Sequence, residues 1–120
     1  MRITREQIRA TADTHFYIYG DTRILDGNGG QAMASRGESN TFAIPVKYAR
    51  CYNDYTSFFD DRLFDTNKQL IDTAVANIIA RARGRKIVVF PKIGLGYNEM
   101  DKRAPKTFEY LCDSLAQFYV

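Results

Sequence analysis

The stretch Ile87-Val88-Val89-Phe90-Pro91-Lys92-Ile93-Gly94-Leu95-Gly96 decides the fold class. Its first four residues form an uninterrupted apolar run of strand formers, which is typical of a parallel strand covered on both faces. Pro91 ends this strand, because proline has no amide hydrogen to donate to a neighbouring strand. The glycine loop that follows stands at the carboxyl end of the strand, where parallel α/β sheets bind their ligands.

Two further strands are predicted nearer the amino terminus. His15–Tyr19 is aromatic and β-branched, and we expect Gly20-Asp21 to end it. Thr41–Val46 has the same character, and Pro45 places this strand at a sheet edge or its proline near a strand end. Both segments are long enough to pair with the strand at residues 87–90.

Helices are predicted between and around these strands from capping signals and from the spacing of apolar residues. They cover a short segment after the capping box Thr4-x-x-Gln7, residues 31–36, a segment from Asp65 or Thr66 to the stop at Gly84, and a segment from Asp101 or Arg103 onwards with Pro105 in its first turn. The alternation of strands and helices predicts a compact, three-layer α/β fold with a mostly parallel central sheet. At 120 residues, the chain is expected to form one domain, residues 1–120.

The segment Tyr48–Phe64 has no clear period and is expected to be a long excursion with a short hairpin or turn. It carries the aromatic residues Tyr48, Tyr52, Tyr55, Phe58, Phe59 and Phe64. Such residues can wall a pocket, pack into the core or form an interface, and the pattern leaves these alternatives open.

The composition excludes several classes of protein. The formal charge is +3, from 17 basic and 14 acidic residues that are interleaved along the chain, so nucleic acid is not expected as a partner, whereas an anionic small ligand is compatible. No apolar run approaches the length of a membrane span, so no membrane contact is expected. The opening residues lack the apolar stretch of a signal peptide, and we therefore expect a cytoplasmic protein.

Metal and thiol chemistry have little support in the sequence. The single histidine, His15, and the two cysteines, Cys51 and Cys112, do not have the short spacing of zinc ligands, so no metal and no cofactor are expected. Cys112 falls on the expected inner face of the last helix and is interpreted as a small core residue. His15 is interpreted as structural.

Glycine loops follow two of the predicted strands, at residues 26–30 and 92–98. Because glycine lacks a Cβ atom, backbone amides in such loops can approach a phosphate closely. Tyr97 adds an aromatic face on which a base can stack. The two loops together predict a site for a nucleotide diphosphate, provided that they meet at one rim of the sheet; simple tight turns are the alternative.

The dinucleotide fingerprint G-x-G-x-x-A is matched by Gly27–Ala32 but lacks its structural context. Seven residues, 20–26, separate the strand from the first glycine. The second strand ends in Val46-Lys47 instead of an acidic residue, which the fingerprint needs for the ribose. A Rossmann dehydrogenase is therefore rejected.

Several blocks of the sequence resemble a group of small phage-encoded proteins and, more distantly, the macrodomains that bind ADP-ribose. The blocks are Tyr17-Ile18-Tyr19-Gly20-Asp21, Gly27-x-Gly29-Gly30-Gln31-Ala32, Asn40-Thr41-Phe42-Ala43-Ile44-Pro45-Val46-Lys47, Phe90-Pro91-Lys92-Ile93-Gly94-Leu95-Gly96 and Ala104-Pro105-Lys106-Thr107. The resemblance covers roughly residues 16–115, without 48–64. It implies a macrodomain-like fold and a pocket for an ADP-ribose-related nucleotide.

The resemblance also implies a set of ligand-binding residues. Asp21 matches the acid near the adenine end, and it could equally cap its own loop. The first loop contributes Gly29, Gly30 and Gln31, and the second loop contributes Gly94, Leu95, Gly96, Tyr97 and Asn98. The implied role is to sequester or recognise an NAD-derived signal during phage infection, in the host cytoplasm.

Two other functions stay open. An ADP-ribosyl hydrolase needs a general base near the distal ribose, for which the candidates are Asp21, Asp26, Asn28 and Asn98. The first loop lacks the lysine of hydrolytic macrodomains, and residues 97–98 replace the aspartate of some relatives, so the resemblance favours binding. A protein-interaction module or host-enzyme inhibitor would use the aromatic segment Tyr48–Phe64, and a host protein or a second copy is its partner.

Overall fold

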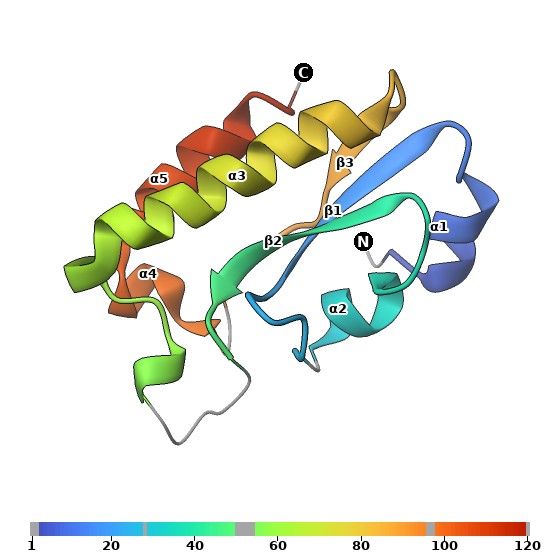
Figure 1. Cartoon of the computed structure of the whole chain (residues 1–120). Helices are drawn as coiled ribbons and strands as arrows, with labels where there is room; N and C mark the ends of the chain where they lie inside the picture. Colours follow the sequence, from blue (N-terminus) through green and yellow to red (C-terminus); the bar gives the residue numbers. More distant parts are fainter. Residues whose placement is uncertain (1–2, 28, 50–54, 96–97, 120) are drawn as a thin grey trace.

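The computed structural model describes the chain except for residues 1–2, 28, 50–54, 96–97 and 120 (Figure 1). Its centre is a parallel sheet of three strands in the order β2-β1-β3, formed by β1 (His15–Thr22), β2 (Thr41–Lys47) and β3 (Lys86–Val89). The prediction of an α/β fold with a parallel sheet is confirmed.

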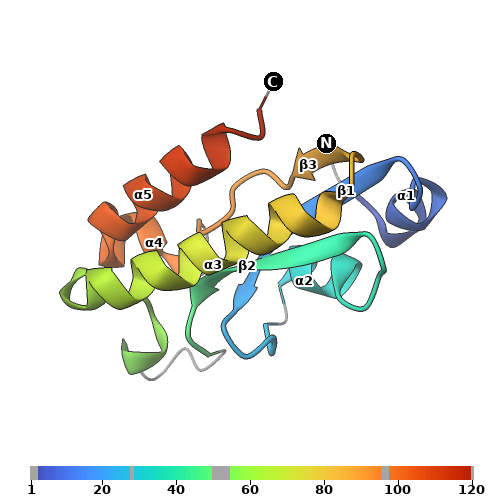
Figure 2. The same cartoon turned by 45° about the horizontal axis from the view of Figure 1, so that its top comes forward.

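Helices cover both faces of the sheet. They are α1 (Arg5–Ala10), α2 (Gly30–Ser35), α3 (Phe64–Ala82), α4 (Met100–Arg103) and α5 (Pro105–Ala116). Figures 1 and 2 show α1 and α2 on one face, and α3 with α5 packed beside it on the other. The molecule therefore has three layers.

The strand order creates a switch point between β1 and β3. From the central strand β1 the chain passes through α2 to β2 at one edge, and then through α3 to β3 at the other edge. The β1–β3 pairing ends at Ile18 and Val89, just before the amide of Phe90 donates to the carbonyl of Ile18 at 2.8 Å. Beyond this point the two strands diverge, and parallel sheets bind ligands at such places.

The core is centred on β1. Phe16, Tyr17, Ile18 and Tyr19 are all buried, because helices pack on both faces of this strand. The capping box predicted at Thr4 and Gln7 is present, and Ile8 of α1 is buried.

The prediction that Gly20-Asp21 ends the first strand is wrong, because β1 continues to Thr22. Gly20 pairs with Ile44, and Asp21 pairs with Pro45. A Cβ atom at Gly20 would lie 3.3 Å from Ile93 Cγ2. The glycine therefore provides space for a packed neighbour inside the strand, a role that its sequence context does not distinguish from a stop.

The expectation that residues 87–90 form a strand covered on both faces is only partly met. Ile87, Val88 and Val89 are half-buried, since β3 is an edge strand. An apolar run indicates helices on both faces, but it does not indicate whether a strand is central. β2 is the other edge strand, in agreement with Pro45.

The start of α3 differs from the prediction. The helix begins at Phe64, before the expected caps Asp65 and Thr66, because the 3-10 helix η2 (Asp61–Leu63) leads directly into it. At the other end Arg83 adopts the left-handed conformation, with φ 51°, and Gly84 follows with φ 80°.

The predicted last helix is divided at Ala104 into α4 and α5, with Pro105 at the first position of α5. Residues before proline are driven out of the helical region, and Ala104 has ψ 64°. The prediction that Cys112 is a core residue is wrong, because its side chain is exposed. Leu111 and Leu115, one helical turn apart, form the buried row instead.

The described aromatic side chains of the segment 48–64 pack into the molecule. Tyr48 contacts Phe59 edge-on at 4.8 Å between ring centroids, and its hydroxyl donates to Asn67. Phe58 and Phe59 are buried, and Phe58 forms an isolated antiparallel bridge with Lys47. The expected short hairpin or turn falls in part on residues 50–54, which lie outside the described residues. Tyr52 lies outside the described residues. Among the described residues, no helix has the length and apolar character needed to cross a bilayer.

Candidate functional site

The side chain of Gln31 on α2 connects β1 with the turn that follows β3. Its Oε1 accepts from the amide of Gly20 at 2.9 Å, and its Nε2 donates to the carbonyl of Pro91 at 2.7 Å. These backbone groups lie where β1 and β3 diverge, so Gln31 supplies the partners that the sheet no longer provides. Gln31 thus connects β1 with the residue that precedes the second predicted loop, whereas Gly94 and Leu95 of that loop pack towards α4 and α5.

The space immediately at the switch point is occupied. Ile93 lies against Gly20 from the second loop, and Gln31 spans the gap from α2. A ligand therefore cannot enter directly between the strand ends. Open space begins beside Gln31, on the face of the sheet that α1 and α2 cover.

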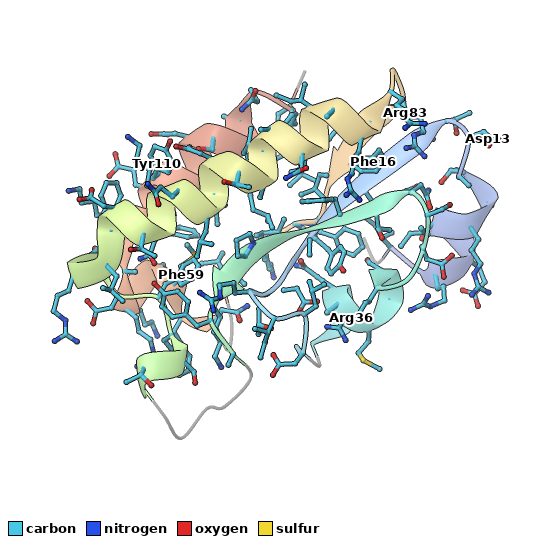
Figure 3. All side chains as sticks on the ribbon, in the orientation of Figure 1. Asp13, Phe16, Arg36, Phe59, Arg83 and Tyr110 are labelled. Atoms are coloured by element: carbon cyan, nitrogen blue, oxygen red, sulfur yellow. The ribbon has the colours of Figure 1, made fainter. Side chains whose placement is uncertain are left out.

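Asp21 lies inside its own loop. Its side chain has no exposed surface; Oδ1 accepts from the amides of Thr22 at 2.7 Å and Gly27 at 3.0 Å, and Oδ2 from Arg36 Nη2 at 2.6 Å. Figure 3 shows Arg36 at the carboxyl end of α2, below β2. Of the two roles considered for Asp21, the structure shows the capping role.

The same ion pair shapes the rest of the first loop. Arg36 also donates to the carbonyl of Gly27 at 2.7 Å, and the Thr22 hydroxyl donates to Asp26 Oδ1 at 2.5 Å. A Cβ atom at Gly27 would lie 2.6 Å from Asp21 Oδ1, so only glycine fits there. These hydrogen bonds connect Asp21, Thr22, Asp26 and Gly27 with one another and with Arg36.

Gly29 and Gly30 have the environment that a phosphate loop needs. Both are exposed, and a Cβ atom at either position would have no neighbour within 4 Å. Gly29 is the N-cap of α2 and makes no side-chain capping bond. The backbone at these residues is therefore open to a ligand.

The second loop is divided between two environments. Gly94 is buried with φ 85°, and a Cβ atom there would lie 2.9 Å from Met100 Sδ and 3.4 Å from Phe108. This packing and the positive φ explain why position 94 requires a glycine. Leu95 lines a small apolar pocket of about 170 Å³ against α5, and Asn98 donates to the carbonyl of Leu95 at 3.4 Å. Gly96 and Tyr97 lie outside the described residues.

A pocket of about 790 Å³ lies beside Gln31. It is bounded by the start of α1, by α2 and by the residues after β3, with the lining Ile3, Thr4, Arg5, Glu6, Gly30, Gln31, Met33, Ala34, Phe90, Pro91 and Lys92. Of the predicted site residues, Gly30 and Gln31 belong to it. Its volume is within the range of small-molecule sites, about 300–1,000 Å³.

The sequence-based prediction missed part of this lining. Residues 3–6 are brought to the pocket by the packing of α1 against α2. Lys92 belongs to the second predicted loop, but the ligand-binding residues predicted there begin at Gly94. The available signal was its place directly after Pro91, at the carboxyl end of a parallel strand.

The described part of the chain offers little support for a catalytic base or for a metal site. The carboxylates of Asp21 and Asp26 are occupied by the loop hydrogen bonds given above, and Asn28 lies outside the described residues. In the same part of the chain, no three His, Cys, Asp or Glu side chains gather as a metal site.

Fold and site define the molecule as an α/β protein with a ligand-sized pocket beside the switch point of a parallel sheet. A family model described as a family of unknown function (DUF7831) matches residues 1–114, so the chain belongs to that family. A search of the curated proteins and a search of the solved structures each returned no match.

Proposed function

We propose that the protein binds an ADP-ribose-related nucleotide in the pocket beside Gln31. The observation that supports this most is a pocket of about 790 Å³ that Gly30 and Gln31 of α2 line together with Pro91 and Lys92 after β3. In parallel α/β sheets this edge is where nucleotides bind.

The lining of the pocket suits the parts of a nucleotide. Ile3, Met33 and Phe90 provide apolar surface for a base, and Met33 is 59% exposed. The bare backbone at Gly30 provides room for a phosphate group close to the main chain. Pockets that combine apolar walls with a few polar groups are typical ligand sites.

The resemblance to macrodomains and to small phage-encoded proteins gives the proposal its ligand class. On this proposal the protein sequesters or recognises an NAD-derived signal in the host cytoplasm during phage infection. Binding is favoured over hydrolysis, because Asp21 and Asp26 hold the loop together and leave no free carboxylate there for a general base.

Calorimetric titration with ADP-ribose tests the proposal. We expect dissociation constants of about micromolar order for the wild type. Ala34→Leu, which enlarges a side chain in the pocket wall, should weaken binding at least about tenfold. Ala80→Leu is the matched control, since Ala80 is exposed on α3 at the other face of the sheet. Absence of heat at millimolar ADP-ribose, or equal affinity of the two variants, would contradict the proposal.

A further inference from the structure

The pocket beside Gln31 contains three charged side chains that differ in how they are paired. Arg5 is fully engaged: its guanidinium donates to Met33 O at 2.7 Å and to the carboxylate of Glu38. It shares that carboxylate with Arg9, whose Nε donates to Glu38 Oε1 at 2.9 Å. Lys92 and Glu6 differ from Arg5 in that neither side chain is held by a partner among the described residues.

Lys92 is exposed, and its ammonium has no hydrogen-bond or ion-pair partner among the residues that the structure describes. Its backbone has φ 59°, a conformation that side-chain-bearing residues rarely adopt. The turn is fixed by the amide of Leu95, which donates to the carbonyl of Lys92 at 3.1 Å. Strained positions of this kind concentrate at ligand sites.

Glu6 reaches the pocket from a different element. It stands in the first turn of α1, is exposed, and makes no hydrogen bond or ion pair within the described ranges 3–27, 29–49, 55–95 and 98–119. A positive and a negative group therefore reach one cavity from two separate walls, with the apolar side chains of Ile3 and Phe90 also in its lining.

We propose that Lys92 binds the phosphate of the nucleotide and that Glu6 accepts hydrogen bonds from its ribose hydroxyls; this assignment rests on the proposed function. An ammonium forms strong, charge-assisted hydrogen bonds with phosphate oxygens. A carboxylate is the acceptor that nucleotide sites commonly offer to a ribose diol. The pair thereby fixes the direction in which the ligand lies, and it makes a phosphate necessary for tight binding.

The ligand preference follows from this arrangement. AMP and ADP-ribose should bind at least about tenfold more tightly than adenosine, since a charged hydrogen bond typically contributes that much. 2′,3′-Dideoxyadenosine should in turn bind more weakly than adenosine, because it has no hydroxyls for Glu6.

Calorimetry on two glycine variants tests the assignment of Lys92. Lys92→Gly removes the ammonium and also relieves the positive φ, so it should not destabilise the fold. Arg83→Gly is the matched control, because Arg83 is also a basic residue at positive φ, 51°, and does not line the pocket. We expect Lys92→Gly to lose at least about tenfold in affinity for ADP-ribose and AMP and less than about twofold for adenosine. Arg83→Gly should bind all three as the wild type does.

The outcomes separate this inference from the proposed function. If the wild type binds none of these compounds, the proposed function fails and the inference fails with it. If the wild type binds ADP-ribose and Lys92→Gly binds it equally well, the role of Lys92 is overturned while the proposed function stands. Glu6→Gln tests the other half: it should reduce the preference for adenosine over its dideoxy analogue, and an unchanged preference would overturn the role of Glu6.

Discussion

The carboxylate of Asp21 is held by the guanidinium of Arg36, with 2.6 Å between Oδ2 and Nη2. The side chain of Asp21 has no exposed surface, whereas that of Arg36 is 33% exposed. The pair connects the loop after β1 with the carboxyl end of α2, the helix that lines part of the candidate site. Asp21, which the sequence analysis included among the ligand-binding residues, therefore holds its own loop together.

Substitution of Arg36 should lower the free energy of unfolding. Arg36→Met leaves a buried carboxylate without its counter-charge, so we expect a loss of about 3 kcal/mol in the free energy of unfolding. Urea denaturation followed by circular dichroism measures it. Arg83→Met, the same change at an exposed position outside any ion pair of the described residues, should change stability by about 0.5 kcal/mol or less. Similar losses of unfolding free energy in both variants would contradict a particular contribution of the Asp21–Arg36 pair to stability.

The two glycines of the first loop should respond differently to alanine. At Gly27 the new Cβ would lie 2.6 Å from Asp21 Oδ1, so Gly27→Ala should destabilise the protein by about 1–3 kcal/mol. At Gly29 the space is open and φ is −69°, so Gly29→Ala should cost less, about 1 kcal/mol or below, because alanine is only a poorer N-cap of α2. Thermal unfolding of both variants gives the comparison, and a lower melting temperature for Gly29→Ala than for Gly27→Ala would contradict it.

The bridge made by Gln31 should be visible in hydrogen exchange. Gln31→Ala removes the acceptor of the Gly20 amide, so this amide should exchange faster, with a loss of about 1 kcal/mol in stability. Gln69→Ala, at an exposed position of α3, is the control and should leave Gly20 unchanged. Unaltered exchange at Gly20 in Gln31→Ala would mean that the bridge does not protect the end of β1.

An acid-sensitive contribution is expected where α1 meets the turn before β2. Hydrogen bonding by Arg9, and then by Arg5, lowers the pKa of Glu38. A pKa depressed in the folded state gives stability that is present above the unfolded value, about 4.3, and is lost as the pH falls through the folded value. The stability difference between wild type and Glu38→Gln should therefore shrink below about pH 4. A difference that stays constant from pH 6 to pH 3 in urea denaturation would contradict this.

The alternation of strands and helices was predictable because it depends on local patterns. The apolar run at 87–90, the aromatic run from His15 and the proline at Pro105 each act within a few residues, and each marks an element of the structure. Element ends were less predictable, because they depend on distant neighbours. Gly20 stays inside β1 since Ile93 packs on it.

The candidate site was predictable only in part, for the same reason. That the loops after β1 and β3 start at the same rim follows from the parallel sheet, and Gly30 and Gln31 indeed line the pocket. The neighbouring residues in the sequence do not indicate that Gly94 is needed for packing against Met100. They also do not indicate that Arg36 forms an ion pair with Asp21. Substitutions at Gly94 are consequently expected to damage the fold and are unsuitable as probes of binding.

The most direct test of the central claim is a titration of ¹⁵N-labelled protein with ADP-ribose, followed by NMR. The account predicts saturable shifts of the amides of Gly30, Gln31 and Lys92, with the amide of Gly84 at the far end of α3 unchanged. An unchanged spectrum at millimolar ADP-ribose, or shifts confined to residues outside the pocket, would contradict it.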